Sequence, residues 1–162
     1  MRISNAKNQL PAVIVSGCLM GTACRYDGST FYVSRMPELL SCCCPIAVCP
    51  ELLVGQKIPR DAVEQVRERA ITINGVDQTS CFQDGAQKVL KIAQDFGAVY
   101  ALLKSGSPSC GSDLVYDGTF SNHLIPGMGF TARLLHDNGI KVFSENNMSE
   151  LIPLLKKKKV KK

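Results

Sequence analysis

The chain lacks a long apolar run and, outside its last residues, any strong excess of charge of one sign. A helix that crosses a bilayer needs roughly 20 mostly apolar residues, and no stretch here approaches that length, so we expect no membrane association. The six lysines within 156–162 outnumber the net charge of +5, which leaves the rest of the chain near neutral. We therefore expect no specific nucleic-acid binding, because that function calls for a basic surface on the folded body.

The chain has few histidines and no Cys-x-x-Cys motif. His123 and His136 are the only histidines, which argues against a histidine-based zinc site. Cys18 and Cys24 are separated by five residues, unlike the Cys-x-x-Cys of zinc ribbons and thioredoxin-like proteins or the closely spaced run of bacterial ferredoxins. The apolar segment 10–15 is too short for a signal peptide. We therefore expect a cytoplasmic protein whose eight cysteines remain reduced and serve a metal or catalysis.

The 162 residues are enough for one domain with a proper core. Short apolar runs alternate with segments of helical periodicity, which predicts a single-domain α/β fold: a mostly parallel, Rossmann-like sheet in three layers with helices on both faces. The predicted strands are 13–16, 46–48, 70–73, 98–103 and 140–143, and the predicted helices are 37–41, 62–70, 81–96, 131–137 and 148–155. We expect the domain to span 10–155 and a disordered basic tail to span 156–162.

Three cysteines each follow one of these apolar runs. Cys18 and Cys49 come after the first two runs, and Cys110 closes a loop after the run that ends at Leu103. In an open α/β sheet, loops at the carboxyl ends of the strands line the ligand crevice. If the three strands are neighbours, the three thiols meet at one site, which suggests a metal or cluster with an open coordination position.

The remaining cysteines allow several interpretations. Cys24 is a second ligand, a nearby thiol or a packed residue. The consecutive cysteines at 42–44 have diverging side chains, so they are expected to pack as small hydrophobic residues before a buried strand. Cys81 lies on a predicted helix face and is expected to be structural.

Two segments carry further candidate side chains. The loop 104–113 is rich in serine and glycine and exceeds what a plain connection needs, which favours a functional loop. Glu51 directly follows Cys49 and Pro50 and is either a general acid/base or a surface residue of a turn. Arg25 either binds substrate or fastens its loop by ion pairing. The candidate substrate-binding residues are Arg25, Ser105, Ser109 and Asp113.

Several of these segments together resemble one known family. The segments 15–28, 48–51, 107–111, 116–120 and 126–132 resemble, in that order, the bacterial thiouracil desulfidase family, long known only as a domain of unknown function. The resemblance covers roughly residues 12 to 146. Pro59-Arg60 and Glu64 resemble a further family segment, from which Asp61 and Val63 depart. The cysteine triplet and the lysine tail are not family features.

The resemblance implies an oxygen-sensitive [4Fe-4S] cluster held by Cys18, Cys49 and Cys110, with one iron free of protein ligands. It implies that Glu51 is the acid/base residue and that Ser107 is the active-site serine. The implied reaction is a non-redox desulfuration: the thiocarbonyl sulfur of a thiolated pyrimidine base or nucleoside meets the free iron, water attacks the carbon, and hydrosulfide leaves. Thiouracil would thus become uracil.

The cysteine pattern is also compatible with two other functions. A non-catalytic iron–sulfur protein that senses oxygen or redox state would use the same cysteines but would leave Glu51 and the hydroxyl-rich loop without a task. A structural zinc domain would bind zinc in place of iron and sulfide. The oligomeric state does not follow from the sequence.

Overall fold

The computed structural model describes residues 9–159 and is built on a four-stranded parallel sheet. Its strands are β1 (Ala12–Ser16), β2 (Cys44–Val48), β5 (Tyr100–Leu103) and β8 (Lys141–Ser144). Their spatial order is β2-β1-β5-β8, and every neighbouring pair is parallel. All four carboxyl ends therefore lie along one edge.

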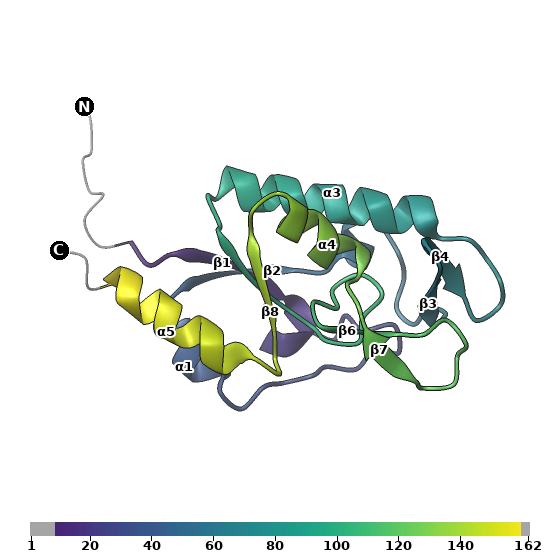
Figure 1. The fold of residues 1–162 in the computed structure, drawn as a ribbon, viewed down its shortest axis with the longest axis horizontal. Coiled ribbons are helices and arrows are strands. Elements are labelled where there is room, and N and C mark those ends of the chain that lie inside the picture. Colours follow the sequence, from purple (N-terminus) through teal and green to yellow (C-terminus); the bar gives the residue numbers. More distant parts are fainter. Residues whose placement is uncertain (1–8, 160–162) are drawn as a thin grey trace.

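Helices cover both faces of this sheet. Figure 1 shows α3 (Thr79–Asp95) and α4 (Phe130–Asp137) on one face, and α1 (Met36–Leu40) with α5 (Met148–Lys159) on the other. The predicted α/β class, with its largely parallel sheet in three layers, is confirmed. A strand covered on both faces has no solvent side, which is why β1 and β5 read as continuous apolar runs rather than alternating ones.

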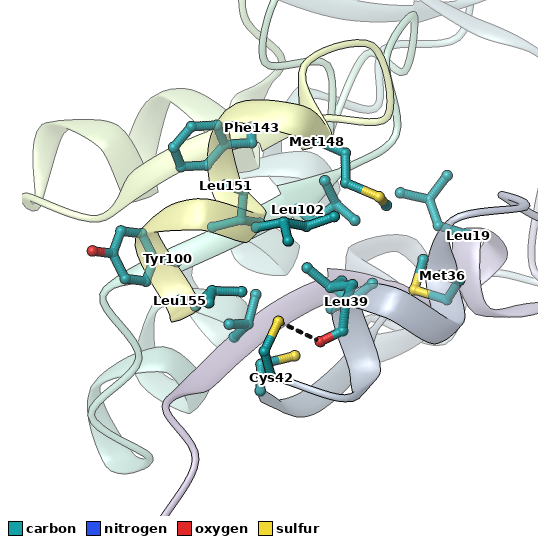
Figure 2. Packing of buried hydrophobic residues seen from close by; sticks show 14 of the residues in the cluster. Leu19, Met36, Leu39, Cys42, Tyr100, Leu102, Phe143, Met148, Leu151 and Leu155 are labelled. Carbon is teal, nitrogen blue, oxygen red and sulfur yellow. Dashed lines mark hydrogen bonds between the residues drawn. The ribbon is translucent and has the colours of Figure 1, made fainter. Parts of the chain in front are cut away.

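Each face of the sheet has its own core. Above it, α3 turns an apolar stripe of helical spacing inward, which includes Phe82, Ala86, Val89, Leu90 and Ala93. Below it, Leu151 and Leu155 of α5 pack beside Leu39 of α1 and Leu102 of β5 (Figure 2).

The cysteine triplet belongs mainly to this lower core. Cys42 and Cys43 are each 2% exposed, and the Cys42 thiol donates a hydrogen bond to the Leu39 carbonyl at 3.2 Å (Figure 2). Cys44 opens β2 and is exposed. The packing interpretation is therefore confirmed for two of the three.

The lysine-rich end is more ordered than expected. Helix α5 continues through Lys159, with Pro153 inside it, so the predicted disordered tail from 156 is wrong as far as Lys159; residues 160–162 lie outside the described part. Lys156 explains part of the extension, because its Nζ lies 3.1 Å from Glu38 on α1. No helix within 9–159 is long and apolar enough to cross a membrane.

Two antiparallel hairpins lie beyond the sheet, near each other in Figure 1. One joins β3 (Val63–Val66) and β4 (Arg69–Thr72), so the helix predicted at 62–70 is wrong and the strand at 70–73 is shifted by one residue. The chain reverses at Arg67, which has a φ of 59°. The other hairpin joins β6 (Leu114–Tyr116) and β7 (Leu124–Pro126) inside the segment expected to be a long loop.

We predict that the adjacent thiols of Cys43 and Cys44 differ sharply in reactivity. Burial raises the pKa of the Cys43 thiol to about 12, so at pH 8 only about one in 10⁴ of these groups is a thiolate. Iodoacetamide labelling of the folded, metal-free protein, mapped by mass spectrometry, should modify Cys44 first, with Cys43 labelling accelerating as the pH rises towards 12. Urea-unfolded protein is the control, and equal rates in the folded protein would contradict the assignment.

Candidate active site

The carboxyl ends of three adjacent strands bring the three predicted cysteines to one cavity. β1 runs into a 3-10 turn (Gly17–Met20) that carries Cys18. β2 is followed directly by Cys49, the N-cap residue of α2 (Pro50–Leu53). Cys110 lies in the loop after β5. Since β1 pairs with both β2 and β5, the expectation that these strands are neighbours is confirmed. All three cysteines line a cavity of about 330 Å³.

A fourth thiol lines the same cavity. The Cys24 side chain is 3% exposed and hydrogen-bonds with the thiols of Cys18 and Cys49. The contact with Cys24, together with burial, raises the pKa of Cys49. Burial raises the pKa of Cys110 to about 12, against the opposing effect of its hydrogen bond with the Ser16 side chain. Burial and the neighbouring thiols therefore favour the protonated forms of Cys24, Cys49 and Cys110.

The thiols of the cavity form a donor set that is compatible with an iron–sulfur cluster. Within 9–159, no three Cys, His, Asp or Glu side chains are placed to hold one metal ion. An iron–sulfur cluster spreads its thiolates over several irons, so its ligands need not converge on one point. Sulfur ligands from separate strand ends around a common cavity fit that requirement, and thiolates favour iron–sulfur clusters over hard cations.

Glu51 lies in the first turn of α2 and is held by Arg60. The Arg60 Nε donates to Glu51 Oε2 at 2.5 Å, and the two side chains are only 10% and 15% exposed. The same guanidinium donates to the carbonyl of Cys24 at 3.0 Å and to that of Lys57 at 3.3 Å. Arg60 thus ties the carboxylate to the loop of the fourth thiol. The interpretation of Glu51 as a plain surface residue does not fit this burial.

Ser107 lines the cavity and shapes the turn before Cys110. Its Oγ accepts hydrogen bonds from the backbone N–H groups of Cys110 at 2.9 Å and Ser109 at 3.2 Å. An oxygen that already accepts two hydrogen bonds has its O–H left as a donor. Ser107 is therefore suited to donate a hydrogen bond into the cavity rather than to remove a proton.

Two of the predicted substrate-binding residues hydrogen-bond with the scaffold and do not line the cavity. Asp113 does not line the cavity: its carboxylate accepts from the side chains of Ser105 at 2.7 Å, Ser144 at 2.9 Å and Asn146 at 3.0 Å, which fastens the loop to the end of β8. Ser109 is fully buried, and its hydroxyl bonds to that of Thr131 on α4 at 2.8 Å. The polar atoms of both side chains are therefore engaged in hydrogen bonds within the scaffold.

The other two candidates do line the cavity. Ser105 lies at its wall, with its backbone N–H donating to Glu145 at 2.8 Å. Arg25 lies over the ring of Phe31, 5.9 Å from the centroid, and Lys104 approaches the same ring at 4.1 Å. The predicted ion pairing of the Arg25 loop takes another form, since Asp27 accepts hydrogen bonds from Ser29.

The sequence alone suggested no role for four charged residues of the wall: Arg60, Asp61, Glu64 and Lys104. Arg60 and Glu64 were marked only as part of a family-like segment, and the wrong helix at 62–70 hid that β3 faces the cavity. Lys104 is the first residue after β5, where the strand-end argument that selected Cys110 applies equally. Its Nζ pairs with Glu145 at 2.7 Å.

We predict that Arg60→Ala destabilises the cluster-free protein. The change leaves the Glu51 carboxylate without its cation at low exposure, which should lower the free energy of unfolding by about 3 kcal/mol. Urea unfolding followed by circular dichroism measures this. The matched control is Arg69→Ala, which breaks the exposed pair with Asp77 and should cost less than about 1 kcal/mol. Equal losses of unfolding free energy would show that the Arg60–Glu51 pair contributes no more to stability than the exposed Arg69–Asp77 pair.

Comparisons with known proteins agree with this geometry. A solved structure described as the [4Fe-4S]-dependent thiouracil desulfidase TudS matches with a TM-score of 0.84 and 38% identity, over 90% of this chain and 98% of that one. The uncharacterized protein YbbK of Bacillus subtilis (strain 168) is 37% identical over 150 residues, which are 86% of this chain and 99% of that protein. The family model of 2-thiouracil desulfurase matches residues 13–147. The chain belongs to the 2-thiouracil desulfurase family.

Proposed function

We propose that this protein is a [4Fe-4S]-dependent enzyme that removes sulfur from a thiolated pyrimidine, base or nucleoside, without net electron transfer. The observation that carries the proposal is the meeting of strand-end cysteines with a clamped carboxylate and a serine hydroxyl in one cavity. A purely structural metal site would have no use for Glu51 and Ser107 beside its ligands. The similarity to a structure described as a thiouracil desulfidase supports the same substrate class.

We assign the cluster to Cys18, Cys49 and Cys110. They come from the ends of three neighbouring strands, whereas Cys24 shares its loop with Cys18 and is enclosed by the contacts with Cys18, Cys49 and Arg60. When bound through three thiolates, such a cluster would supply a Lewis-acidic iron to polarise the carbon–sulfur bond of the substrate.

The residues of the chain would supply the proton transfers. Arg60 engages Oε2 of Glu51, and Oε1 has no donor among residues 9–159, so Oε1 is the oxygen that can take a proton from an attacking water. The Ser107 hydroxyl would donate a hydrogen bond to the polar edge of the pyrimidine or to the water. Returning the Glu51 proton to the departing sulfur balances the reaction, in which the carbon exchanges sulfur for the water oxygen and hydrosulfide is released.

We predict that Glu51→Gln abolishes most of the sulfide release while the cluster remains. Loss of a general acid/base lowers the rate by about 10²- to 10⁴-fold. The assay is sulfide release from 2-thiouracil and 4-thiouracil by the anaerobically reconstituted protein, with iron and acid-labile sulfide measured per chain. A protein that contains zinc but no iron would rule out the cluster assignment. An iron-loaded wild-type protein that releases no sulfide would favour a sensor.

Single cysteine variants should rank the ligands. We expect Cys18→Ser, Cys49→Ser and Cys110→Ser each to lose most of their iron on reconstitution, because each removes one of three thiolates. Cys24→Ser is the matched control in the same cavity and should retain more. Iron content with the visible absorption of the cluster measures the difference. Iron loss from Cys24→Ser but not from Cys18→Ser would transfer the first ligand position to Cys24.

A further inference from the structure

A second carboxylate of the cavity has no part in the reaction described above. Glu64 lies on β3, lines the cavity and is 7% exposed. Lysines and arginines neutralise other acids at this end of the molecule: Arg60 pairs with Glu51, and Lys104 pairs with Glu145. Glu64 makes no salt bridge within the described part of the chain. A buried carboxylate with no cation partner calls for hydrogen-bond donors.

One oxygen of Glu64 has its donors. Its Oε2 accepts from the backbone N–H of Gly118 at 2.9 Å and of Phe120 at 3.0 Å, both in the loop between β6 and β7. These two residues have left-handed φ values of 88° and 56°. The loop is thereby bent so that two N–H groups, separated by one residue along the chain, point at one oxygen. The carboxylate is consequently held in a fixed orientation at the cavity wall.

The other carboxylate oxygen of Glu64, Oε1, has no hydrogen-bond donor within the described part of the chain. Every fully buried side-chain oxygen or nitrogen in that part has a hydrogen-bond partner. This oxygen is therefore not sealed in the protein. Since the residue lines the cavity and is otherwise buried, Oε1 is reached from the cavity. It is an acceptor without a partner, at a fixed place in a ligand site.

We infer that Oε1 of Glu64 accepts the ring N3–H of the thiolated pyrimidine and so determines which substrates react. The inference rests on the proposed function. In both 2-thiouracil and 4-thiouracil, N3–H adjoins the thiocarbonyl carbon, so one acceptor orients the reacting carbon in either isomer. A site built around a buried acceptor rejects a ligand that lacks the matching donor, because the acceptor is then left unpaired.

The test compares N3–H and N3-methyl ligands on the wild-type enzyme and on Glu64→Gln. Glutamine keeps a carbonyl oxygen for the N–H groups of Gly118 and Phe120 but turns an N–H₂ donor towards the cavity. Wild-type enzyme should prefer 4-thiouracil over its N3-methyl analogue by about 10- to 100-fold in kcat/KM. That preference should fall to a few-fold in Glu64→Gln. Glu68→Gln, an exposed glutamate in the turn of the same hairpin, should behave as wild type.

A binding measurement separates recognition from support of the loop. By calorimetry, wild-type protein should bind uracil more tightly than 3-methyluracil, and Glu64→Gln should bind both alike. A variant that loses both ligands, or both activities, in equal proportion would give Glu64 a structural role only and overturn the inference. Equal binding of the two ligands by wild-type protein would also overturn the inference, and this result needs no variant to fold.

The outcomes also separate the inference from the proposed function. If wild-type enzyme desulfurates thiouracil and Glu64→Gln keeps the wild-type preference, only the inference fails. If wild-type enzyme releases no sulfide and binds no pyrimidine, the proposed function fails with it.

Discussion

The parallel pairing of β1 with β2 on one side and β5 on the other is the constraint on which the site depends. The register sets Ser16 opposite Val48, and Val15 opposite Leu102, so the three strands end at the same level. Cys49 lies one residue, Cys18 two residues and Cys110 seven residues beyond the end of a hydrogen-bonded strand, so the sheet fixes where each of the three loops begins. A slip of one strand would turn its side chains to the other face and remove its cysteine from the cavity.

Buried acids hold the loops that close the site. Asp113 and Glu145 fasten the loop 104–113 to the end of β8, Glu51 joins α2 to Arg60, and Glu64 fastens the turn between β6 and β7. Asp113, Glu145 and Glu64 each accept at least two hydrogen bonds from other segments, and Glu51 accepts one from Arg60. Such bonds to a charged acceptor contribute more than neutral ones. Hydrogen bonds to these acids therefore help to fix the walls of the cavity.

The central sheet and its strand-end cysteines could be predicted because buried parallel strands leave a clear apolar signature, and their connections place the loops. The hairpin at 63–72 could not, because a short strand with charged residues on both sides, such as Glu64 and Arg69, resembles an exposed helix; only tertiary hydrogen bonds reveal it. Asp113 and Ser109 looked like ligands because polar side chains in a loop have the same composition whether they bind a substrate or the scaffold. The partners that decide, Ser144 and Thr131, lie on other elements.

The wide separation of the cysteines along the chain has a consequence for the order of assembly. Ferredoxins take most ligands of a cluster from one short loop, so a cluster can organise the chain around itself. No single loop holds the three cysteines here, because Cys18, Cys49 and Cys110 become neighbours only after β1, β2 and β5 have paired. A cluster held by these three cysteines would therefore enter a polypeptide that has already folded, and would stabilise that state by mass action rather than nucleate it. A maturation factor delivering iron and sulfide would meet a finished pocket, not an unfolded chain.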